Sequence, residues 1–488
     1  MSDKFNRRQF IKDLSLGAAA LALLPNVSIA RKRNNLTIQG TPKNVVILGG
    51  GLAGLAAAYE LKKAGHTVTV LEARKQPGGR VRTLRDFDDG LYAEAGPVAF
   101  PESHTFTWDY TREFSLPIRP AFRIDLDSLA NIRGQQFRIG PSSTTIPLDL
   151  KASERQAGIG GMPALYLGNY MREVGNPRRA GFPTEMLRQI DSLSLRQLLI
   201  NEGASEDAIR IIEASQLGIL GFGLDSVSAM DGVVTEAIAS DAIFYEIIDG
   251  MDLLPSALKK KVKKQFRKAA IVERLEQTAT GVTVYYTQGG ESLSINADRV
   301  ICTIPFPVLK NIPVTPAFSA EKQQVINELK LTPVTRTYLQ FRRRIWEESK
   351  LSGYGITDLN VQNTYSPTIT QPGARGILAS YAGGQRALDL SAMSETDRQS
   401  EVQRQMSGMF GVTKKQLDMG ISQIWHEDPW TRGGFAYFEP GQMATLLPLA
   451  QQAEGRIHFA GEHTSAWHGW MNGALESGVR AAEEVNNA

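Results

Sequence analysis

The sequence "VVILGGGLAG", from Val45 to Gly54, joins an apolar run to a glycine-rich loop. The β-branched residues at its start are typical of a buried parallel strand. Gly49, Gly51 and Gly54 follow with G-x-G-x-x-G spacing, and a segment of helical periodicity comes next. A second apolar run, "TVTVLEA", then contains Glu72. A strand, a glycine loop, a helix, a second strand and an acid in this order predict a dinucleotide-binding unit.

The glycines of this loop have separate predicted tasks. Gly49 permits a tight turn, Gly51 lets the backbone approach a pyrophosphate, and Gly54 lets the helix pack closely on the strand. The N-terminus of the helix offers unpaired N–H groups and a partial positive charge to phosphates. Glu72 lies about 18 residues after Gly54, where an acidic side chain bonds a ribose diol.

The composition is that of an ordinary globular protein. Of 488 residues, 42% are hydrophobic and 22% are charged, which is enough chain for two or three domains. The net charge is only +3 and includes the N-terminal Lys4, Arg7, Arg8 and Lys12, so the rest of the chain is close to neutral. We therefore expect no nucleic acid partner. The densest basic run, "KKKVKKQFRK" at residues 259–268, is expected to form a solvated helix face.

Cysteine and histidine give no sign of disulfide or metal chemistry. Cys302 is the single cysteine, so an intramolecular disulfide is excluded. It lies in the apolar run "RVICTIP", which predicts a core thiol on a buried strand rather than a nucleophile. The six histidines are scattered without the spacing of metal ligands, so no metal centre is expected.

The first thirty residues have the features of an export signal. The charged "NRRQFIK" is followed by the apolar "LSLGAAALALLP" and by small residues up to Ala30. The apolar run is shorter than the roughly 20 residues that span a bilayer, so we expect no stable membrane anchor. Arg7, Arg8 and Phe10 resemble the twin-arginine signal, which implies export of the folded protein to the periplasm or beyond. An ordinary secretory signal or an anchor helix with a basic start is the alternative.

Three segments resemble the flavin amine oxidase family. "EARKQPGGRVRT" (Glu72–Thr83) resembles the extension after the second strand, and "KAAIVERLEQTATGVTVYY" (residues 268–286) resembles the strand pair at the adenine end. "RIHFAGEHTSAWHGWMNGALESGVRAAEEV" (Arg456–Val485) resembles the C-terminal signature. The resemblance covers most of residues 44–485 and is thin between about 130 and 245. It implies a noncovalently bound FAD.

The resemblance also implies how the chain would hold FAD. Arg80 would cross the pyrophosphate, Arg74 would add charge, and Glu462 would meet the ribityl chain and phosphates. The helix that begins near Met471 would direct its N-terminus at the flavin and stabilise its reduced form. The predicted cofactor residues are Gly49, Gly51, Leu52, Ala53, Gly54, Glu72, Ala73, Arg74, Gly79, Arg80, Gly96, Pro97, Val98, Val272, Gly461, Glu462, Gly469, Trp470 and Met471.

The predicted fold class is α/β. A discontinuous, Rossmann-like FAD-binding domain would be joined to a mixed-sheet substrate domain and a helical lobe, as in the amine oxidase and glutathione reductase type of architecture. The signal peptide would occupy residues 1–30. The other predicted ranges are 41–95, 246–325 and 450–488 for FAD, 96–150 and 326–449 for the substrate domain, and 151–245 for the helices.

The carboxylate-binding part of the predicted substrate site departs from the family pattern. "GLYAEAGPVAFP" resembles the loop at the reactive face of the flavin, where L-amino acid oxidases commonly carry an arginine that clamps the substrate carboxylate. Ala99 stands at that position, and Arg119 or Arg123 is a substitute that the sequence leaves open. Tyr365, in "QNTYSPTI", matches a carboxylate-binding tyrosine; a buried sheet tyrosine is the alternative.

The other walls of the predicted site are mostly aromatic. Phe435 replaces the cysteine that some monoamine oxidases bond to the flavin, and Ala436 replaces a cage aromatic, so the cage is incomplete. Gly469 and Trp470 would lie beside the amine, whereas Trp467 is a wall or an ordinary core residue. Arg336 falls where the family holds a lysine next to the reactive flavin nitrogen; a surface arginine is the alternative.

The predicted function is oxidative deamination of L-amino acids to 2-oxo acid, ammonia and hydrogen peroxide, with oxygen as acceptor. Arg336, Tyr365, Gly469 and Trp470 are the predicted catalytic residues. Ala99 favours an alternative, an oxidase or dehydrogenase of primary amines or polyamines that lack a carboxylate. A flavin-binding protein without turnover is a third hypothesis. The expected partners are a small amino acid or amine and oxygen, and a homodimer is left open.

Overall fold

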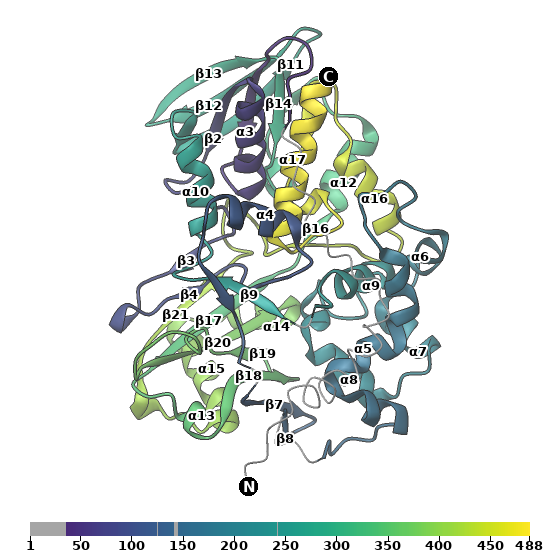
Figure 1. Cartoon of the computed structure of the whole chain (residues 1–488), viewed down its shortest axis with the longest axis vertical. Helices are drawn as coiled ribbons and strands as arrows, with labels where there is room; N and C mark the ends of the chain where they lie inside the picture. The colour runs from purple at the N-terminus through teal and green to yellow at the C-terminus, as the bar shows by residue number, and fades with distance from the viewer. Residues whose placement is uncertain (1–35, 124, 141–144, 242) are drawn as a thin grey trace.

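The computed structural model describes residues 36–123, 125–140, 145–241 and 243–488. The predicted signal peptide, residues 1–30, lies outside these described residues. A parallel sheet with its helices occupies the upper part of Figure 1, and a mixed sheet and a group of helices lie side by side below it. None of the helices described here is both long and apolar enough to cross a bilayer.

The parallel sheet is built from short apolar strands that are far apart in the sequence. Its order is β10-β2-β1-β14-β23, and Val45 to Leu48 of β1 are fully buried. Every strand runs parallel to its neighbours, so the carboxyl ends of β1, β2 and β14 meet at one edge. The bounds are β1 Asn44–Leu48, β2 Thr67–Glu72, β10 Phe266–Lys268, β14 Arg299–Cys302 and β23 Ile457–Phe459.

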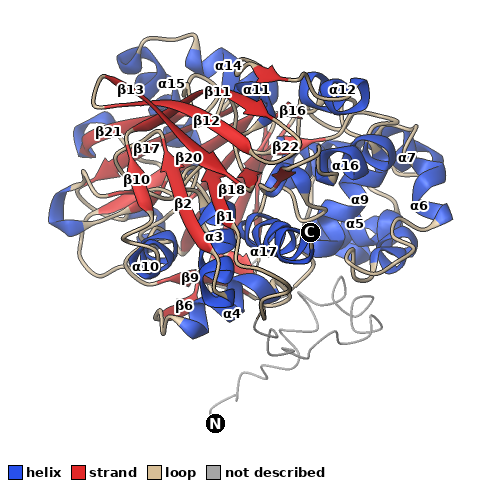
Figure 2. Cartoon of the chain, turned by 90° about the horizontal axis from the view of Figure 1, so that it is seen from above, coloured by secondary structure: helices blue, strands red, loops and turns tan. Residues whose placement is uncertain are grey.

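Helices cover one face of this sheet, and a second, mostly antiparallel sheet covers the other (Figure 2). Ala56, Ala57 and Ala58 are fully buried, and these small side chains allow α3 to pack closely against the sheet and α17. The helices on this face are α3 Leu52–Ala64, α10 Leu253–Lys261 and α17 Met471–Asn487. The second sheet contains β11 Ala270–Gln277, β12 Val282–Gln288, β13 Glu291–Ala297 and β15 Val314–Thr315.

The basic run 259–268 does not form the single helix face that its lysines predicted. Helix α10 ends at Lys261, a turn follows, and Phe266 begins β10 at the edge of the parallel sheet. The apolar Val262 and Phe266 pack into the core beneath the exposed lysines, so tertiary packing overrides the charge pattern. Cys302 is buried at the end of β14, and burial raises the pKa of its thiol to about 12.

The mixed sheet has the order β21-β17-β20-β19-β18-β7-β8. One face packs on α14 and α15. On the other face, Tyr338 and Tyr365 both pair with Ala379, and Arg336 pairs with Tyr381, so these side chains share one surface. The bounds are β7 Asp127–Ile132, β8 Gln135–Ile139, β17 Val334–Phe341, β18 Leu351–Thr357, β19 Asn363–Tyr365, β20 Gly376–Gly383, β21 Leu417–Ile424, α14 Gly384–Ser391 and α15 Glu395–Phe410.

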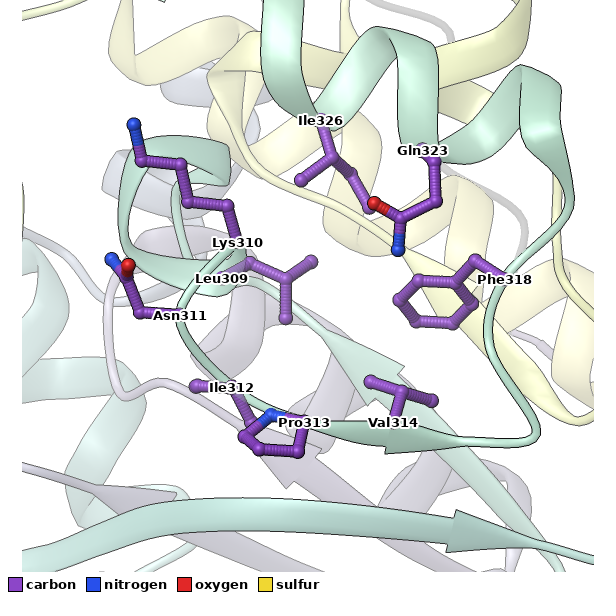
Figure 3. Close-up of a pocket in the computed structure, with 9 residues that line it drawn as sticks. All are labelled: Leu309, Lys310, Asn311, Ile312, Pro313, Val314, Phe318, Gln323 and Ile326. Atoms are coloured by element: carbon purple, nitrogen blue, oxygen red, sulfur yellow. The ribbon is translucent and has the colours of Figure 1, made fainter.

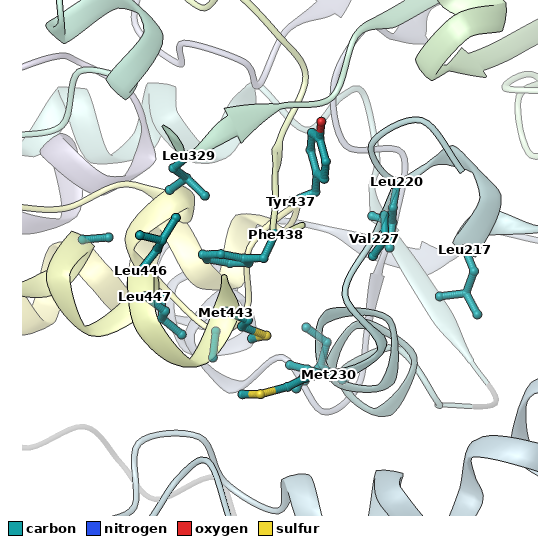
Figure 4. Packing of buried hydrophobic residues seen from close by; sticks show 14 of the residues in the cluster. Leu217, Leu220, Val227, Met230, Leu329, Tyr437, Phe438, Met443, Leu446 and Leu447 are labelled. Carbon is teal, nitrogen blue, oxygen red and sulfur yellow. The ribbon is translucent and has the colours of Figure 1, made fainter. Parts of the chain in front are cut away.

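The helical lobe packs on the C-terminal part of the chain. Figure 4 shows side chains of α9 and α16 meeting Tyr437 and Phe438 in one cluster, and Phe438 is fully buried there. The amide of Phe438 donates to Asp231, so α9 lies next to the segment that leads into α16. The bounds are α5 Ala152–Val174, α6 Glu185–Ile190, α7 Leu195–Asn201, α8 Glu206–Ala214, α9 Ala229–Ile238 and α16 Met443–Gln451.

Short elements connect these layers. The strands are β3 Thr83–Leu84, β4 Ala93–Glu94, β5 Phe100–Pro101, β6 Ile118–Pro120, β9 Phe244–Ile247, β16 Lys330–Leu331 and β22 Ala436–Tyr437. The helices are α4 Thr105–Glu113, α11 Phe306–Leu309, α12 Ala320–Glu328 and α13 Ile345–Glu348. The 3-10 turns are η1 Asp88–Gly90, η2 Gln216–Ile219, η3 Lys414–Gln416 and η4 Glu462–Thr464.

Candidate active site

Of the three motif glycines in the loop after β1, only Gly51 has room for a side chain, whereas Gly49 and Gly54 are crowded by neighbouring atoms. A Cβ at Gly49, whose φ is +108°, would lie 2.3 Å from Oγ1 of Thr303. A Cβ at Gly54 would lie 2.0 Å from the carbonyl oxygen of Gly49. At Gly51 the nearest protein atom is the carbonyl oxygen of Gly78, 3.9 Å away. The loop therefore presents bare backbone at Gly51, which fits the pyrophosphate of a dinucleotide.

The N-terminus of α3 faces the same loop. No side chain caps this helix, and its first turn holds no acidic residue. Leu52 and Ala53 are buried, so the polar groups of this turn are backbone N–H groups. The helix end therefore keeps its unpaired N–H groups and partial positive charge for a phosphate.

Glu72 lies at the carboxyl end of β2, and its carboxylate is oriented by two backbone groups. Oε2 accepts a hydrogen bond from the amide of Gly50 at 2.6 Å, and Oε1 accepts one from the amide of Arg74 at 2.7 Å. Burial raises the pKa of Glu72 above its usual value. Each oxygen keeps a free lone pair, so the carboxylate can also accept the hydroxyls of a ribose.

A second loop, residues 73–80, lies against the glycine loop. The amide of Gly78 donates to the carbonyl oxygen of Gly50 at 2.9 Å. Arg74 binds Asp428 at 2.6 Å and donates to the carbonyl oxygen of Gly79 at 3.3 Å. The positive charge predicted for Arg74 is therefore balanced by Asp428, and Ala73 is half-buried beside it.

Glu462 joins three separate segments of the chain. Its carboxylate accepts hydrogen bonds from Arg80 at 2.5 Å, from the amide of Gly469 at 2.7 Å and from the amide of Ala436 at 3.2 Å. Burial raises the pKa of Glu462, but Arg80 and the other charged and polar neighbours outweigh it and lower the pKa overall. Arg80 also donates to the carbonyl oxygen of Gly434 at 2.9 Å. Glu462 and Arg80 thus fix the positions of the 73–80 loop, the 434–436 segment and the start of α17 relative to one another.

Arg336 is buried, with 4% of its surface exposed, and is not a surface arginine. Its Nη1 donates to the carbonyl oxygens of Glu94, at 3.0 Å, and of Gly96. Its guanidinium carbon lies 3.8 Å from the centre of the Tyr381 ring. Arg336 therefore fixes a third loop, which continues through the half-buried Pro97 and Val98, against the mixed sheet.

Two buried polar groups beside this loop have unused hydrogen-bonding capacity. Nε of Arg336 and the Tyr365 hydroxyl have no partner within hydrogen-bond geometry among the residues that the structure describes, although the Tyr338 hydroxyl lies near enough to Tyr365 to influence its pKa. Burial raises the pKa of Tyr365, so its hydroxyl is protonated and can donate. Because buried polar groups are rarely left unpaired, these donors are suited to a ligand with acceptor oxygens.

The two alternative arginines for carboxylate binding are engaged elsewhere. Nε of Arg119 donates to Glu246 at 2.6 Å, and the exposed Arg123 forms an ion pair with Asp125. Ala99 is buried immediately before β5. The structure therefore brings neither arginine together with Tyr365, and Arg336 is the cation that it places on that face.

Gly469 and Trp470 lie together at the start of α17. Gly469 has a φ of +77°, which favours glycine, and a Cβ there would lie 3.7 Å from the Phe435 ring. The Trp470 ring packs edge-on against the His104 ring, with 4.8 Å between the ring centroids, and its centroid lies 6.4 Å from that of the Phe244 ring. The first turn of α17 has no acidic residue and no side-chain cap, so its positive end is available to a ligand.

The remaining predicted residues occupy different parts of the same region. Val272 is half-buried on β11, Gly461 has a φ of +131° before η4, and the buried Met471 begins α17. Ala436 lies on β22, and Trp467 packs on the large core cluster that includes the helical lobe.

The convergence of these loops is the arrangement that the flavin amine oxidase resemblance implied. A family model for flavin-containing amine oxidoreductases matches residues 52–486. The chain belongs to this family. As a member of the flavin-containing amine oxidoreductases it uses FAD, and the open backbone at Gly51 and the carboxylate of Glu72 fit the pyrophosphate and ribose of that cofactor.

Curated relatives of this amine oxidoreductase include L-amino-acid oxidases. YobN of Bacillus subtilis (strain 168), which is named as a candidate L-amino-acid oxidase, is 36% identical over 479 residues. That match covers 93% of this chain and 97% of YobN. The L-amino-acid oxidase of Bothrops pauloensis is 30% identical over 466 residues, which cover 93% of this chain and 92% of the relative.

Solved structures of amine oxidases share the fold of this chain. Wild-type putrescine oxidase bound to putrescine matches with a TM-score of 0.79 at 24% identity, covering 91% of this chain and 99% of that one. Cyclohexylamine oxidase from Brevibacterium oxydans matches with a TM-score of 0.78 at 20% identity, again over 91% and 99%. These matches confirm the predicted fold class.

A buried ion pair that the sequence did not reveal supports the start of α17. Nε2 of His468 lies 2.6 Å from Oδ1 of Asp231 on α9, and both side chains are almost completely buried. The other carboxylate oxygen of Asp231 accepts the amide of Phe438 at 2.7 Å. Burial lowers the pKa of His468, but the attraction of Asp231 outweighs it and raises the pKa. The helical lobe thus holds the segment that leads to Gly469.

A separate pocket of about 210 Å³ lies outside this region (Figure 3). It lies between α11, β15 and α12, and none of the predicted site residues lines it. Among the residues that the structure describes, no group of three histidine, cysteine, aspartate or glutamate side chains could hold a metal ion.

Proposed function

We propose that this protein oxidatively deaminates L-amino acids, giving a 2-oxo acid, ammonia and hydrogen peroxide. The observation that carries the proposal is the pair of unsatisfied buried donors, the Tyr365 hydroxyl and Nε of Arg336, on one face of the mixed sheet. A substrate carboxylate would satisfy both donors. The L-amino-acid oxidases among its relatives, which match 93% of the chain, agree with this substrate class.

The chain contributes binding and orientation to this reaction. FAD, when bound, would supply the acceptor for the hydride on the carbon that carries the amine, with oxygen as the final oxidant. Arg336 and Tyr365 would fix the carboxylate, and the Gly469–Trp470 segment would line the space for the amine. Aromatic side chains around Trp470 would keep water away from the reacting carbon.

An amine without a carboxylate is the second candidate substrate. It is favoured by Ala99, which stands where a clamping arginine is expected, and by the fold shared with putrescine oxidase. The predicted catalytic roles of Arg336, Tyr365, Gly469 and Trp470 are part of our proposal. Export of the folded chain by the twin-arginine route is also part of our proposal. Residues 1–30, which would carry that signal, lie outside the residues that the structure describes.

The test of this function is peroxide release from single substrates in air. We expect the purified holoenzyme to release hydrogen peroxide and ammonia in equal amounts with L-amino acids, and not with their D-enantiomers. Release of peroxide from primary amines alone would move the assignment to the second candidate. An absence of peroxide with both substrate classes would contradict oxidase function.

Replacing Tyr365 by phenylalanine tests the carboxylate-binding role. The Tyr365→Phe variant removes the unpaired hydroxyl and keeps the ring, so KM for L-amino acids should rise by about 10- to 100-fold. Amines without a carboxylate should show a change of less than about threefold. Tyr285→Phe is the matched control, because the Tyr285 hydroxyl binds Glu276 on the separate antiparallel sheet. Equal effects on both substrate classes would remove the carboxylate role.

A further inference from the structure

His104 is a fully buried histidine at the junction of α4, α9 and α17. It is the N-cap residue of α4, and its amide donates to the carbonyl oxygen of Pro101, in β5, at 3.2 Å. Nε2 of its ring lies 3.0 Å from the carbonyl oxygen of Ile238 at the end of α9. Because a carbonyl oxygen only accepts hydrogen bonds, Nε2 carries the proton of the ring. This bond fixes both the tautomer and the orientation of the ring.

The same ring supports Trp470. The His104 and Trp470 rings meet edge to face, with 4.8 Å between their centroids and 83° between their planes. Nδ1 of His104 has no hydrogen-bond partner in the part of the chain that the structure describes, so its ring is held by one polar and one aromatic contact. Burial lowers the pKa of His104 to about 3, so the ring is neutral and serves as a packing surface.

Asn472 joins the first turn of α17 directly to the first turn of α4. Its Oδ1 accepts hydrogen bonds from the amides of Phe106, at 3.0 Å, and Thr107, at 3.2 Å, and only 1% of its surface is exposed. The first amides of a helix have no partner within that helix, so Asn472 satisfies two of them. The ring of His104 cannot move away from Trp470 with α4 unless these hydrogen bonds break.

The Trp470 ring is covered where it meets His104 and open elsewhere. Trp470 is half-buried and the preceding Gly469 is exposed, whereas His104 is completely buried. Phe244 also packs against the Trp470 ring, with 6.4 Å between the ring centroids. His104 and Phe244 therefore fix the position of a ring that keeps a free surface for a ligand.

We propose that His104 is a positioning residue for the oxidation, because its ring holds Trp470 where Trp470 forms the wall beside the substrate amine. This inference rests on the proposed function, in which the Gly469–Trp470 segment lines the space for the amine. A displaced wall would let the reacting carbon move relative to the flavin, and a misplacement of about 1 Å costs about 100-fold in rate. Since the amine is common to amino acids and simple amines, the role of His104 is the same for both substrate classes.

Three variants separate the ring contact from the hydrogen bond. His104→Phe keeps a ring beside Trp470 but loses the bond to Ile238, His104→Gln keeps an N–H donor but loses the ring, and His104→Ala loses both. The quantity measured is the limiting rate of flavin reduction per bound FAD, after anaerobic mixing with single L-amino acids or primary amines.

We expect the limiting rates of His104→Gln and His104→Ala to lie about 10- to 100-fold below that of the wild type. Their half-saturating substrate concentrations should change by less than about threefold, since the loss concerns geometry rather than binding. His104→Phe should keep the wild-type rate within about threefold and have a lower Tm, because the carbonyl oxygen of Ile238 loses its donor.

The matched control is His66→Phe. His66 is a buried histidine whose Nε2 lies 2.9 Å from Oδ1 of Asn486, near the other end of α17. This variant should have a lower Tm and an unchanged rate of flavin reduction. The flavin absorbance spectrum of all four variants should match that of the wild type and so report an intact cofactor site.

Wild-type rates in His104→Gln and His104→Ala, or loss of FAD from them, would overturn the inference and leave amino acid oxidation intact. Equal slowing in His104→Phe and His104→Gln would also overturn it, because the ring contact would then have no part. Slowing that is seen with an amine, in a protein that amino acids do not reduce, would support the inference and overturn the proposed function. A wild-type flavin that neither substrate class reduces would contradict both.

Discussion

A Gly51→Val variant should fold and should lose FAD. The backbone at Gly51 has a φ of −75°, which valine adopts, and the nearest protein atom to a new Cβ is 3.9 Å away. The side chain would instead occupy the space in which the cofactor pyrophosphate meets bare backbone. Loss of two or more hydrogen bonds to a charged group corresponds to about 100-fold weaker binding, or more.

The measurement is the flavin content of the purified variant together with its far-ultraviolet circular dichroism. Gly54→Ala is the contrasting variant, because its Cβ would lie 2.0 Å from the carbonyl oxygen of Gly49 and would disturb the packing of α3 on the strand. We expect folded, colourless protein for Gly51→Val and unstable protein for Gly54→Ala. A yellow Gly51→Val protein with normal FAD content would contradict this assignment of the loop.

An Asp231→Asn variant should lose about 3–5 kcal/mol of stability. The carboxylate of Asp231 accepts from both His468 and the amide of Phe438, and an asparagine would direct an N–H group at one of these donors. The His468 ring would also lose its buried counter-ion. Because His468 immediately precedes Gly469 and Trp470, the start of α17 should become less ordered.

Thermal unfolding of the holoenzyme measures this loss. Asp225→Asn is the control, since Asp225 is largely exposed in its pair with Arg196 and should change Tm little. The pKa of His468 is raised in the folded state, so the stabilisation is complete below pH 6.5 and is lost as the pH rises through the raised pKa. A wild-type Tm in Asp231→Asn would show that the pair does not hold the two segments together.

Much of the cofactor region follows from local sequence. The glycine spacing and the position of Glu72 depend on residues close to one another in the chain, and their physical requirements are visible as a pattern. The structure places an open backbone at Gly51 and two crowded glycines beside it, as the separate predicted tasks require. Arg336 is matched to the family lysine only by counting residues back along a predicted strand. That spacing does not predict that Arg336 is buried.

The contacts of the helical lobe could not be predicted from the sequence. Asp231 and His468 are 237 residues apart, and neither lies in a sequence motif that predicts an ion pair. The prediction of a single helix face for residues 259–268 is wrong for a similar reason. The exposed lysines continue through the run, so the charge pattern does not indicate where the helix ends and the edge strand begins.

Anaerobic mixing of the purified holoenzyme with single L-amino acids tests amino acid oxidation most directly. The quantity measured is the visible absorbance of the flavin, which disappears when a bound substrate is oxidised. We predict that L-amino acids remove this absorbance and that air restores it. Absorbance that survives every L-amino acid but disappears with an amine that lacks a carboxylate would contradict the proposed function.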